Sequence, residues 1–266
     1  MTIITNPLAV VTGASSGIGL ELARQFAQHG FDLVLAAEGM DVVVAAQELS
    51  GLGTQVHCVQ ADLATYEGVE HLCAAILSLG RPVDSIAINA GVGVGGDFTR
   101  QTDLRDELNL INLNITSSVH LAKRVLPGMV ARRQGRVLFT SSIAAKMPAP
   151  FEAVYGASKA FLLSFSEALR NELKDTGVTV TALLPGPTET NFFHRAGLDD
   201  TRVGAQKKDD PAEVARQGFE ALMAGDDKVI AGSFSNKVQG AMSNILPDTA
   251  TAQAHRKLSE PGSASK

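Results

Sequence analysis

Tyr155 and Lys159 are two residues whose types and spacing suggest proton-transfer chemistry. They stand four positions apart in a segment of helical periodicity, so the phenol and the ammonium share one face of the predicted helix. A phenol titrates at about pH 10 in water, and a nearby cation favours the phenolate. We therefore expect Lys159 to lower the pKa of Tyr155 toward working pH, where Tyr155 can act as a general acid or base. Exposed helices also show this spacing by chance, so its meaning depends on the rest of the chain.

A glycine-rich turn near the N-terminus predicts a phosphate-binding site. Residues 8–11 form a short apolar run typical of a buried parallel strand, and a helical pattern follows from Ile18. Gly13, Gly17 and Gly19 lie between them, where glycine lets the backbone turn tightly and lets a pyrophosphate approach the helix N-terminus. The spacing G-x-x-x-G-x-G differs from the G-x-G-x-x-G pattern, although the same mechanism applies. A purely structural turn is the alternative.

Strands and helices alternate along the whole chain, which favours an α/β fold with a doubly wound parallel sheet and helices on both faces. Such sheets bind ligands in the crevice outside the carboxyl ends of the strands, where the candidate residues of this chain fall. We predict about seven strands, at residues 8–11, 32–36, 55–60, 84–89, 136–140, 178–184 and 229–231. Helices are predicted at 41–49, 65–79, 103–132 with an interruption near Pro127, 154–174, and from Asp210 onward.

Length and charge bound the organisation of the chain. Its 266 residues, 45% of them apolar, can bury one core, so we expect one domain over residues 1–258, a helical extension from about residue 235 broken at Pro247, and a flexible tail at 259–266. A net charge of −5 argues against nucleic acid or an anionic membrane as partner. No signal segment or membrane span is predicted, so the expected location is cytoplasmic. Cys58 and Cys73 are predicted to be core thiols.

The motifs of this chain, taken in order, resemble those of the short-chain dehydrogenase/reductase family. That family has a Rossmann-like fold and carries T-G-x-x-x-G-x-G, N-A-G, an Asn, a Ser, Y-x-x-x-K and P-G-x-x-x-T. The matching elements span roughly residues 8–190: they are 12–19, 89–91, Asn114, Ser142, Tyr155 with Lys159, and Pro185-Gly186 with Thr190. Ser142 stands thirteen residues before Tyr155, which matches the family spacing and favours it over Ser141. Asn112 is the alternative to Asn114 as the Asn of this motif set, and the position of Asn114 is the one that matches the family.

The resemblance implies an NAD(P)-dependent oxidoreductase that interconverts a secondary alcohol and a ketone of a small-molecule substrate. Tyr155 would be the general acid/base, and Ser142 would hydrogen-bond the substrate oxygen. Lys159 would lower the pKa of Tyr155 and bind the nicotinamide ribose, while Asn114 would hold a water that links Lys159 to solvent. Hydride transfer makes an alkoxide from a ketone, and two hydrogen-bond donors stabilise that oxygen. A non-redox epimerase or dehydratase with bound cofactor, and a nucleotide-binding regulatory protein without turnover, are the alternatives.

The resemblance also implies which residues contact the cofactor, whereas Thr12 is expected to tie the first and fourth strands together. The implied contacts are Gly13, Ser15, Ser16, Gly17, Ile18 and Gly19 around the pyrophosphate, Asp62 and Leu63 at the adenine, Asn89, Ala90 and Gly91 at the adenine ribose, and Pro185, Gly186, Thr188 and Thr190 at the nicotinamide.

The end of the second strand bears on the choice between NAD and NADP. Family members that use NAD usually place an acid there, and NADP users often place Arg one residue later. Ala37 and Glu38 stand at these two positions, and Ser16 is not a cation. A carboxylate repels a 2′-phosphate but accepts hydrogen bonds from a ribose diol. We therefore predict NAD over NADP, with Glu38 pointing into solvent as the alternative.

The predicted pocket walls, residues 92–96, 143–151 and 189–198, are mostly apolar. Met147, Phe192 and Phe193 predict a substrate with a hydrocarbon portion, although the two phenylalanines could instead pack a lid onto the core. No metal site is predicted. We expect a homodimer or homotetramer that assembles through the long helices 103–132 and 154–174.

Overall fold

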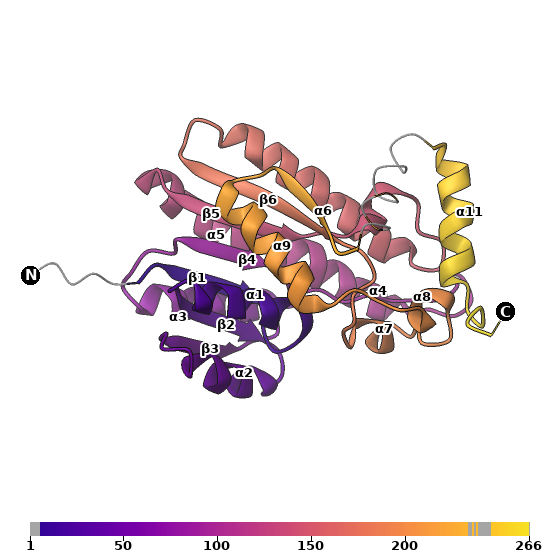
Figure 1. Ribbon diagram of the computed structural model, residues 1–266, viewed down its shortest axis with the longest axis horizontal. Coiled ribbons are helices and arrows are strands. Elements are labelled where there is room, and N and C mark those ends of the chain that lie inside the picture. The colour runs from indigo at the N-terminus through magenta and orange to yellow at the C-terminus, as the bar shows by residue number, and fades with distance from the viewer. Residues whose placement is uncertain (1–5, 234–235, 237, 239–245, 266) are drawn as a thin grey trace, which may run out of the picture.

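The computed structural model describes residues 6–233, 236, 238 and 246–265. Its centre is a seven-stranded sheet in the order β3-β2-β1-β4-β5-β6-β7, with every pair of neighbours parallel (Figure 1). The strands are β1 Leu8–Thr12, β2 Asp32–Ala37, β3 Val56–Gln60, β4 Ser85–Ile88, β5 Gly135–Thr140, β6 Val178–Pro185 and β7 Lys228–Ala231. The strand order reverses between β1 and β4, and such a switch point is where open α/β sheets bind ligands. The predicted doubly wound α/β fold is confirmed.

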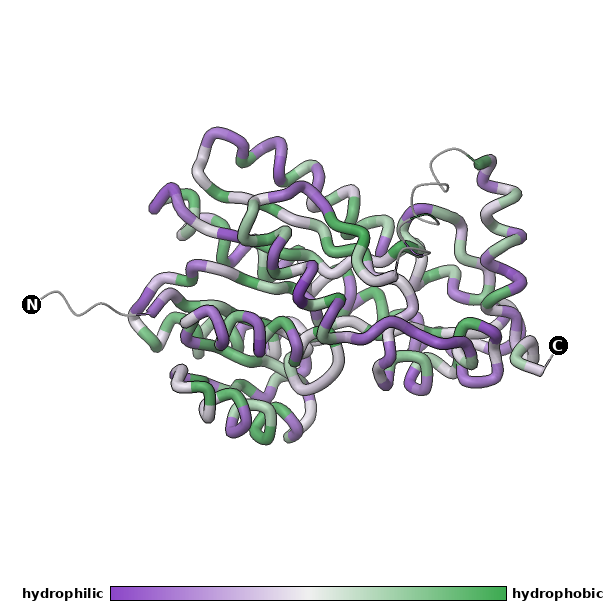
Figure 2. Tube along the Cα trace, viewed as in Figure 1, coloured by the Kyte–Doolittle hydropathy of each residue, from purple (hydrophilic) through white to green (hydrophobic). Residues whose placement is uncertain are grey.

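Helices cover both faces of the sheet, and the sheet separates two hydrophobic cores. Their bounds are α1 Gly17–Gln28, α2 Asp41–Ser50, α3 Tyr66–Ser78, α4 Leu104–Ile111, α5 Ser117–Arg132, α6 Ala153–Glu172, α7 Phe192–Arg195, α8 Arg202–Ala205, α9 Pro211–Ala224 and α11 Asp248–Ser259. Val10 points into the core beneath α3, α5 and α6, and Val11 into the core beneath α1, α2 and α9. Figure 2 shows hydrophilic residues recurring along the outer helices.

The helix starts predicted at Thr65 and Asp210 are confirmed, and a glycine follows the end of α1. Thr65 caps α3 by accepting a hydrogen bond from the Gly68 N–H. Asp210 caps α9, accepting from the Ala212 N–H, and Pro211 occupies the first turn. After α1, Gly30 adopts φ +78°, the left-handed conformation in which a helix-ending glycine has no steric cost.

The predicted interruption near Pro127 is wrong. α5 runs through Pro127, which is exposed, so that water can hydrogen-bond the carbonyl that proline leaves free. Regular α-helix is lost earlier instead, in a π-helical turn at Asn112–Thr116 that joins α4 to α5.

The prediction that Cys58 is a core thiol is also wrong, although Cys73 is buried as expected. Cys58 lies in β3, which forms an edge of the sheet and exposes three of its five residues. A strand-like run of residues does not reveal whether the strand is central or lies at an edge.

The C-terminal segment packs against the rest of the molecule. α11 begins directly after Pro247, as predicted, while the part of the expected extension at 234–235, 237 and 239–245 lies outside the described residues. The segment expected to be a flexible tail instead contacts α8 and the residues just before it. The Ala264 N–H donates to the Asp200 carbonyl at 2.9 Å, and the Arg202 N–H donates to Ser263 Oγ at 3.0 Å. The one-domain organisation stays a prediction. Across the described ranges, no helix combines the length and hydropathy needed to cross a membrane.

Candidate active site

A cleft of about 1050 Å³ opens where the strands end at their carboxyl side. Residues directly after β1, β2, β3, β4, β5 and β6 all line it, so it occupies the ligand-binding position of a doubly wound sheet. Of the predicted site residues, the cleft brings together Gly13, Ser15, Ser16, Gly17, Ile18, Gly19, Glu38, Asp62, Leu63, Asn89, Ala90, Gly91, Ser142, Tyr155, Lys159, Pro185, Gly186, Thr188 and Thr190. Asn114 is not among the residues that line it.

The glycine turn is too closely packed to accept side chains. Gly13 has φ +65°, and a Cβ there would lie 2.9 Å from Ala90 Cα. Gly17 has φ +56°, and a Cβ there would lie 2.8 Å from Thr190 Cγ2. The backbone at the start of α1 therefore borders the cleft without a side chain in between, and its N–H groups and helix dipole suit a pyrophosphate. These residues fit the dinucleotide that the sequence predicts.

Thr12 has the structural role expected of it. Its hydroxyl accepts hydrogen bonds from the Asn89 N–H at 2.9 Å and the Ala90 N–H at 3.0 Å. Asn89 extends the connection, because its amide donates to the Thr12 carbonyl and accepts from the Thr140 hydroxyl, both at 3.0 Å. The ends of β1, β4 and β5 are thereby fixed relative to one another beneath the cleft.

The end of β2 presents negative charge to the cleft. Glu38 is exposed there, and Asp41 at the start of α2 also lines the cleft. Among the described residues of the cleft wall, the lysines and arginines are Lys159, Arg195 and Lys207, none of which belongs to the β1–α1 turn or to β2. This part of the cleft thus has carboxylates and, among the described residues of its wall, no lysine or arginine.

Ser142, Tyr155 and Lys159 meet at the other end of the cleft. Ser142 lies two residues after the end of β5 and caps a short 3-10 turn, Ile143–Lys146, by accepting from the Ala144 N–H. Tyr155 and Lys159 lie on the same face of α6, and both are buried. Lys159 Nζ donates to the Thr140 carbonyl at 2.9 Å and lies 5.7 Å from the centre of the Tyr155 ring.

Burial shifts the pKa values of this pair. It raises the pKa of Tyr155 above its usual range, and the Glu152 carboxylate raises it further, while the nearby Ser142 hydroxyl opposes both. Burial lowers the pKa of Lys159 to about 8. The direction for Tyr155 is opposite to the one predicted from Lys159, because burial and the Glu152 carboxylate both disfavour the phenolate.

Asn114 is fully buried in the π-helical turn. Its amide accepts from the Val92 N–H and donates to the Val92 carbonyl and to Ser158 Oγ, each at 3.0 Å. Asn114 therefore fixes the loop after β4 to α6, one residue beyond Gly91. The water relay through Asn114 stays a prediction.

The region after β6 supplies two aromatic residues to the cleft. Phe192 lines the cleft with its ring centre 5.1 Å from that of Tyr155. Phe193 also lines the cleft and packs with Ala196, Leu198 and Val203 in a small core, against which Phe192 packs as well. The contacts of these two residues therefore fit both alternatives, hydrocarbon binding and the packing of a lid.

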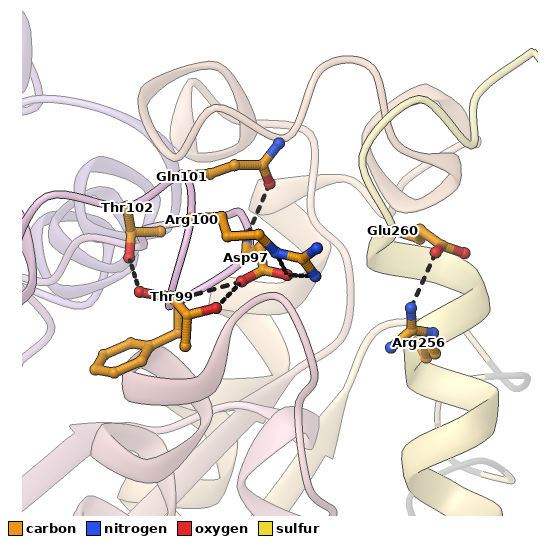
Figure 3. Close-up of polar contacts among 8 residues, drawn as sticks. Asp97, Thr99, Arg100, Gln101, Thr102, Arg256 and Glu260 are labelled. Carbon is orange, nitrogen blue, oxygen red and sulfur yellow. Dashed lines mark hydrogen bonds and ion pairs between the residues drawn. The ribbon is translucent and has the colours of Figure 1, made fainter.

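The later part of the loop after β4 is held in shape by its own side chains. Asp97 accepts hydrogen bonds from the Thr99 hydroxyl at 2.7 Å and from Arg100 Nη2 at 2.5 Å, and its N–H donates to Gln101 Oε1 at 2.8 Å (Figure 3). The pKa of Asp97 is held far below its usual range by these donors, Arg100 above all. The preceding segment is pinned too, because the Gly96 N–H donates to the Phe151 carbonyl at 2.8 Å.

Glu152, His255 and Ser259 also line the cleft, and the sequence reasoning missed all three. Glu152 stands three residues before Tyr155, a spacing that places both near one helix face and could have drawn attention to it. His255 and Ser259 lie on α11, about a hundred residues away, and no local pattern indicated that this helix reaches the cleft.

Comparison with known proteins gives a consistent result. A family model described as short chain dehydrogenase matches residues 7–200. The chain is 29% identical over 260 residues to Oxidoreductase UcpA of Salmonella typhimurium, covering 92% of this chain and 97% of that protein. It is 34% identical over 233 residues to Dehydrogenase/reductase SDR family member 7B of Mus musculus, covering 82% of this chain and 71% of that protein.

Solved structures show the same architecture. A short-chain dehydrogenase from Sphingobium yanoikuyae in complex with NADPH is 30% identical, with a TM-score of 0.77 over 90% of this chain and 94% of that one. A short chain dehydrogenase/reductase from Burkholderia phymatum in complex with NAD has a TM-score of 0.83 over 95% of this chain and 97% of that one; at 22% identity it shows the fold alone.

Proposed function

The chain belongs to the short-chain dehydrogenase family, and from that membership we propose that it interconverts a secondary alcohol and a ketone by hydride transfer. The observation that carries the proposal is the convergence of Ser142, Tyr155 and Lys159 in the cleft that begins at the glycine turn. When bound, the nicotinamide dinucleotide would supply or accept the hydride. The protein would supply binding, orientation and a proton.

Each of the three side chains has a chemical task in this proposal. Tyr155 keeps its proton at neutral pH because burial raises its pKa, so it suits the role of proton donor to a carbonyl oxygen. Ser142 provides a second hydrogen-bond donor for the same oxygen, which stabilises the developing negative charge. Lys159, held by the Thr140 carbonyl, is placed to bind the nicotinamide ribose and to favour the phenolate once Tyr155 has given up its proton.

We propose NAD as the preferred cofactor. Glu38 and Asp41 line the cleft at the end of β2 and the start of α2, where we expect the adenosine ribose to bind. Two carboxylates there would repel a 2′-phosphate and accept hydrogen bonds from a ribose diol. The substrate is proposed to be partly apolar, because Phe192 and Met147 line the cleft near Tyr155.

The first test is the thermal midpoint with NAD, NADH, NADP and NADPH. A ligand that binds only the native state at ~100 times its Kd stabilises it by about 2.7 kcal/mol, which is readily measured. The proposal expects a larger rise with NAD or NADH than with the phosphorylated pair. A rise with NADP and NADPH alone would overturn the cofactor preference, and no rise with any of them would favour a protein without turnover.

The second test is Tyr155→Phe, which removes the proton donor and keeps the ring. We expect turnover to fall by about 10²-fold or more, as for loss of a general acid, while the thermal rise with cofactor is retained. Unchanged turnover in this variant would exclude Tyr155 as the acid. Cofactor binding with substrate conversion but no change in nicotinamide absorbance would point to the non-redox alternative.

A further inference from the structure

Glu152 is a carboxylate buried inside the cleft, close to the proposed proton donor. It is 6% exposed, precedes α6 at its N-cap position and stands three residues before Tyr155. Its charge is felt at the phenol, whose pKa it raises. A buried carboxylate is costly unless its oxygens are hydrogen-bonded, so the partners of Glu152 indicate what it is for.

The partners come from α11 and use one oxygen only. Ser259 Oγ donates to Glu152 Oε1 at 2.7 Å, and His255 Nε2 lies 3.2 Å from the same oxygen. Ser259 Oγ and His255 Nε2 are also 3.2 Å apart. Within the described part of the chain, Glu152 Oε2 has no hydrogen-bond partner, although a carboxylate accepts about four hydrogen bonds in total.

The same helix holds the turn that carries Glu152. Arg256 places its guanidinium 4.8 Å from the centre of the Phe151 ring, and Phe151 has φ +66°, a conformation unusual for an aromatic residue. Leu258 lines the cleft between the two polar residues of α11 and packs toward the cluster around Phe193. α11 therefore forms a wall of the cleft, with its polar side chains gathered on Glu152.

A tether between α11 and α6 would not need these three groups to line the cleft. It would be served by the bonds to Oε1 alone, whereas Oε2 has no hydrogen-bond partner among the described residues and is not one of their fully buried unpaired atoms. A ligand in the cleft that donates a hydrogen bond would pair with this accessible oxygen.

We propose that Glu152, His255 and Ser259 form a substrate subsite that binds a hydrogen-bond-donating group, a hydroxyl or an ammonium, carried by the carbonyl substrate. This inference rests on the proposed function and names its substrate class: a ketone with an apolar portion beside Phe192 and a donor group directed at Glu152. Glu152 is then a specificity-determining residue, and α11 is the element that completes the site.

The test uses sets of three ketones of nearly equal size that differ in one group, a methyl, a hydroxyl or an ammonium. Butanone, hydroxyacetone and aminoacetone form the shortest set, and longer sets move the group away from the carbonyl. We expect the wild-type enzyme to prefer the donor-bearing members at one position by about tenfold or more in kcat/KM, as for a hydrogen bond to a charged group. Glu152→Ala should abolish that preference, so that the kcat/KM values of the three members of each set become nearly equal whatever the activity that remains.

Two further variants separate the possible causes. Glu152→Gln keeps the size of the side chain and one acceptor oxygen, so a preference for ammonium should be lost and a preference for hydroxyl largely kept. Glu260→Gln removes a carboxylate next to α11 that does not line the cleft and is bound by Arg256, and it should change nothing.

The outcomes distinguish this inference from the function beneath it. Turnover of the ketones without any preference that depends on Glu152, or an equal loss for all three members of each set in Glu152→Gln, would overturn the subsite and leave the oxidoreductase standing. Absence of turnover with every ketone, despite cofactor binding, would count against the proposed function itself and against the subsite that rests on it.

Discussion

Lys159 is a charged side chain held where burial opposes its charge. It is 4% exposed, and burial lowers its pKa from 10.5 to about 8. The unfolded chain therefore binds more protons than the native protein between about pH 8 and pH 10, and stability rises with pH wherever that is so. This gain in the free energy of unfolding is complete above the pKa of Lys159 in the unfolded chain, and it is lost as the pH falls through the pKa of Lys159 in the folded protein.

This residue gives a prediction on stability. Between pH 8 and pH 10, the free energy of unfolding of the wild-type protein should rise relative to that of Lys159→Met by about 1 kcal/mol for each pH unit. Urea unfolding of both proteins at several pH values, without cofactor, measures the difference. Below that window the two curves should run parallel, because the bond to the Thr140 carbonyl that the variant lacks does not titrate. Parallel curves throughout would show that Lys159 titrates normally.

For single residues, the sequence predicted correctly which side chains come together, and it predicted the wrong direction for the pKa shift of Tyr155. The spacing of Tyr155 and Lys159 placed both groups on one face of a helix, as found. The direction of the pKa shift of Tyr155 could not be predicted, because it depends on how completely α6, α11 and the loops exclude water. Those elements come from distant parts of the chain.

The π-helical turn between α4 and α5 shows how an element can be predicted with its irregularity misplaced. Proline is the usual breaker of a helical pattern, so Pro127 attracted the prediction. Its exposed position lets α5 continue, whereas nothing in the apolar periodicity marks Asn112–Thr116. The side-chain bonds of Asn114 to Val92 are long-range in sequence, and single-sequence periodicity carries no signal for them.

Asn114 gives a prediction for this element. Asn114→Ala leaves the N–H and carbonyl of Val92 without their partner, so the free energy of unfolding should fall by about 1–3 kcal/mol. Asn112→Ala is the matched control, because that side chain is exposed in the same turn, and its effect should stay within about 0.5 kcal/mol. Chemical denaturation of the two variants decides the matter. An equal effect of both substitutions would mean that the turn, rather than the Asn114 amide, sets the stability of this loop.

For the whole molecule, the alternation of apolar runs and helical patterns was enough to predict the class of fold and the edge of the sheet that binds the ligand. The seven strands were found at the expected places, with no end displaced by more than one residue. The position of α11 could not be predicted, since an amphipathic helix near a chain end has no sequence feature that states which surface it covers. Two of the three polar cleft residues that were missed, His255 and Ser259, were missed for that reason.

The long helices are the elements through which we expect copies of the chain to associate. The sequence predicts a homodimer or homotetramer through residues 103–132 and 154–174. An apolar groove of about 480 Å³ lies on these elements, lined by Phe98 together with Ile111, Ile115, Val154 and Phe161 among others. Phe98 and Phe161 are exposed, and a groove of this composition is typical of a surface that a partner covers.

Phe161→Glu should therefore convert the oligomer into monomers, because a carboxylate cannot be buried at an apolar contact without a partner. Phe161 is 39% exposed in the single chain, so the variant has room for the new side chain in the monomer. Leu77→Glu is the matched control: Leu77 is 79% exposed at the end of α3 and lies outside the groove. Sedimentation velocity of the three proteins at equal concentration measures the mass of each. Oligomers that survive Phe161→Glu but not Leu77→Glu would move the interface to α3, and a monomeric wild-type protein would reject the assembly altogether.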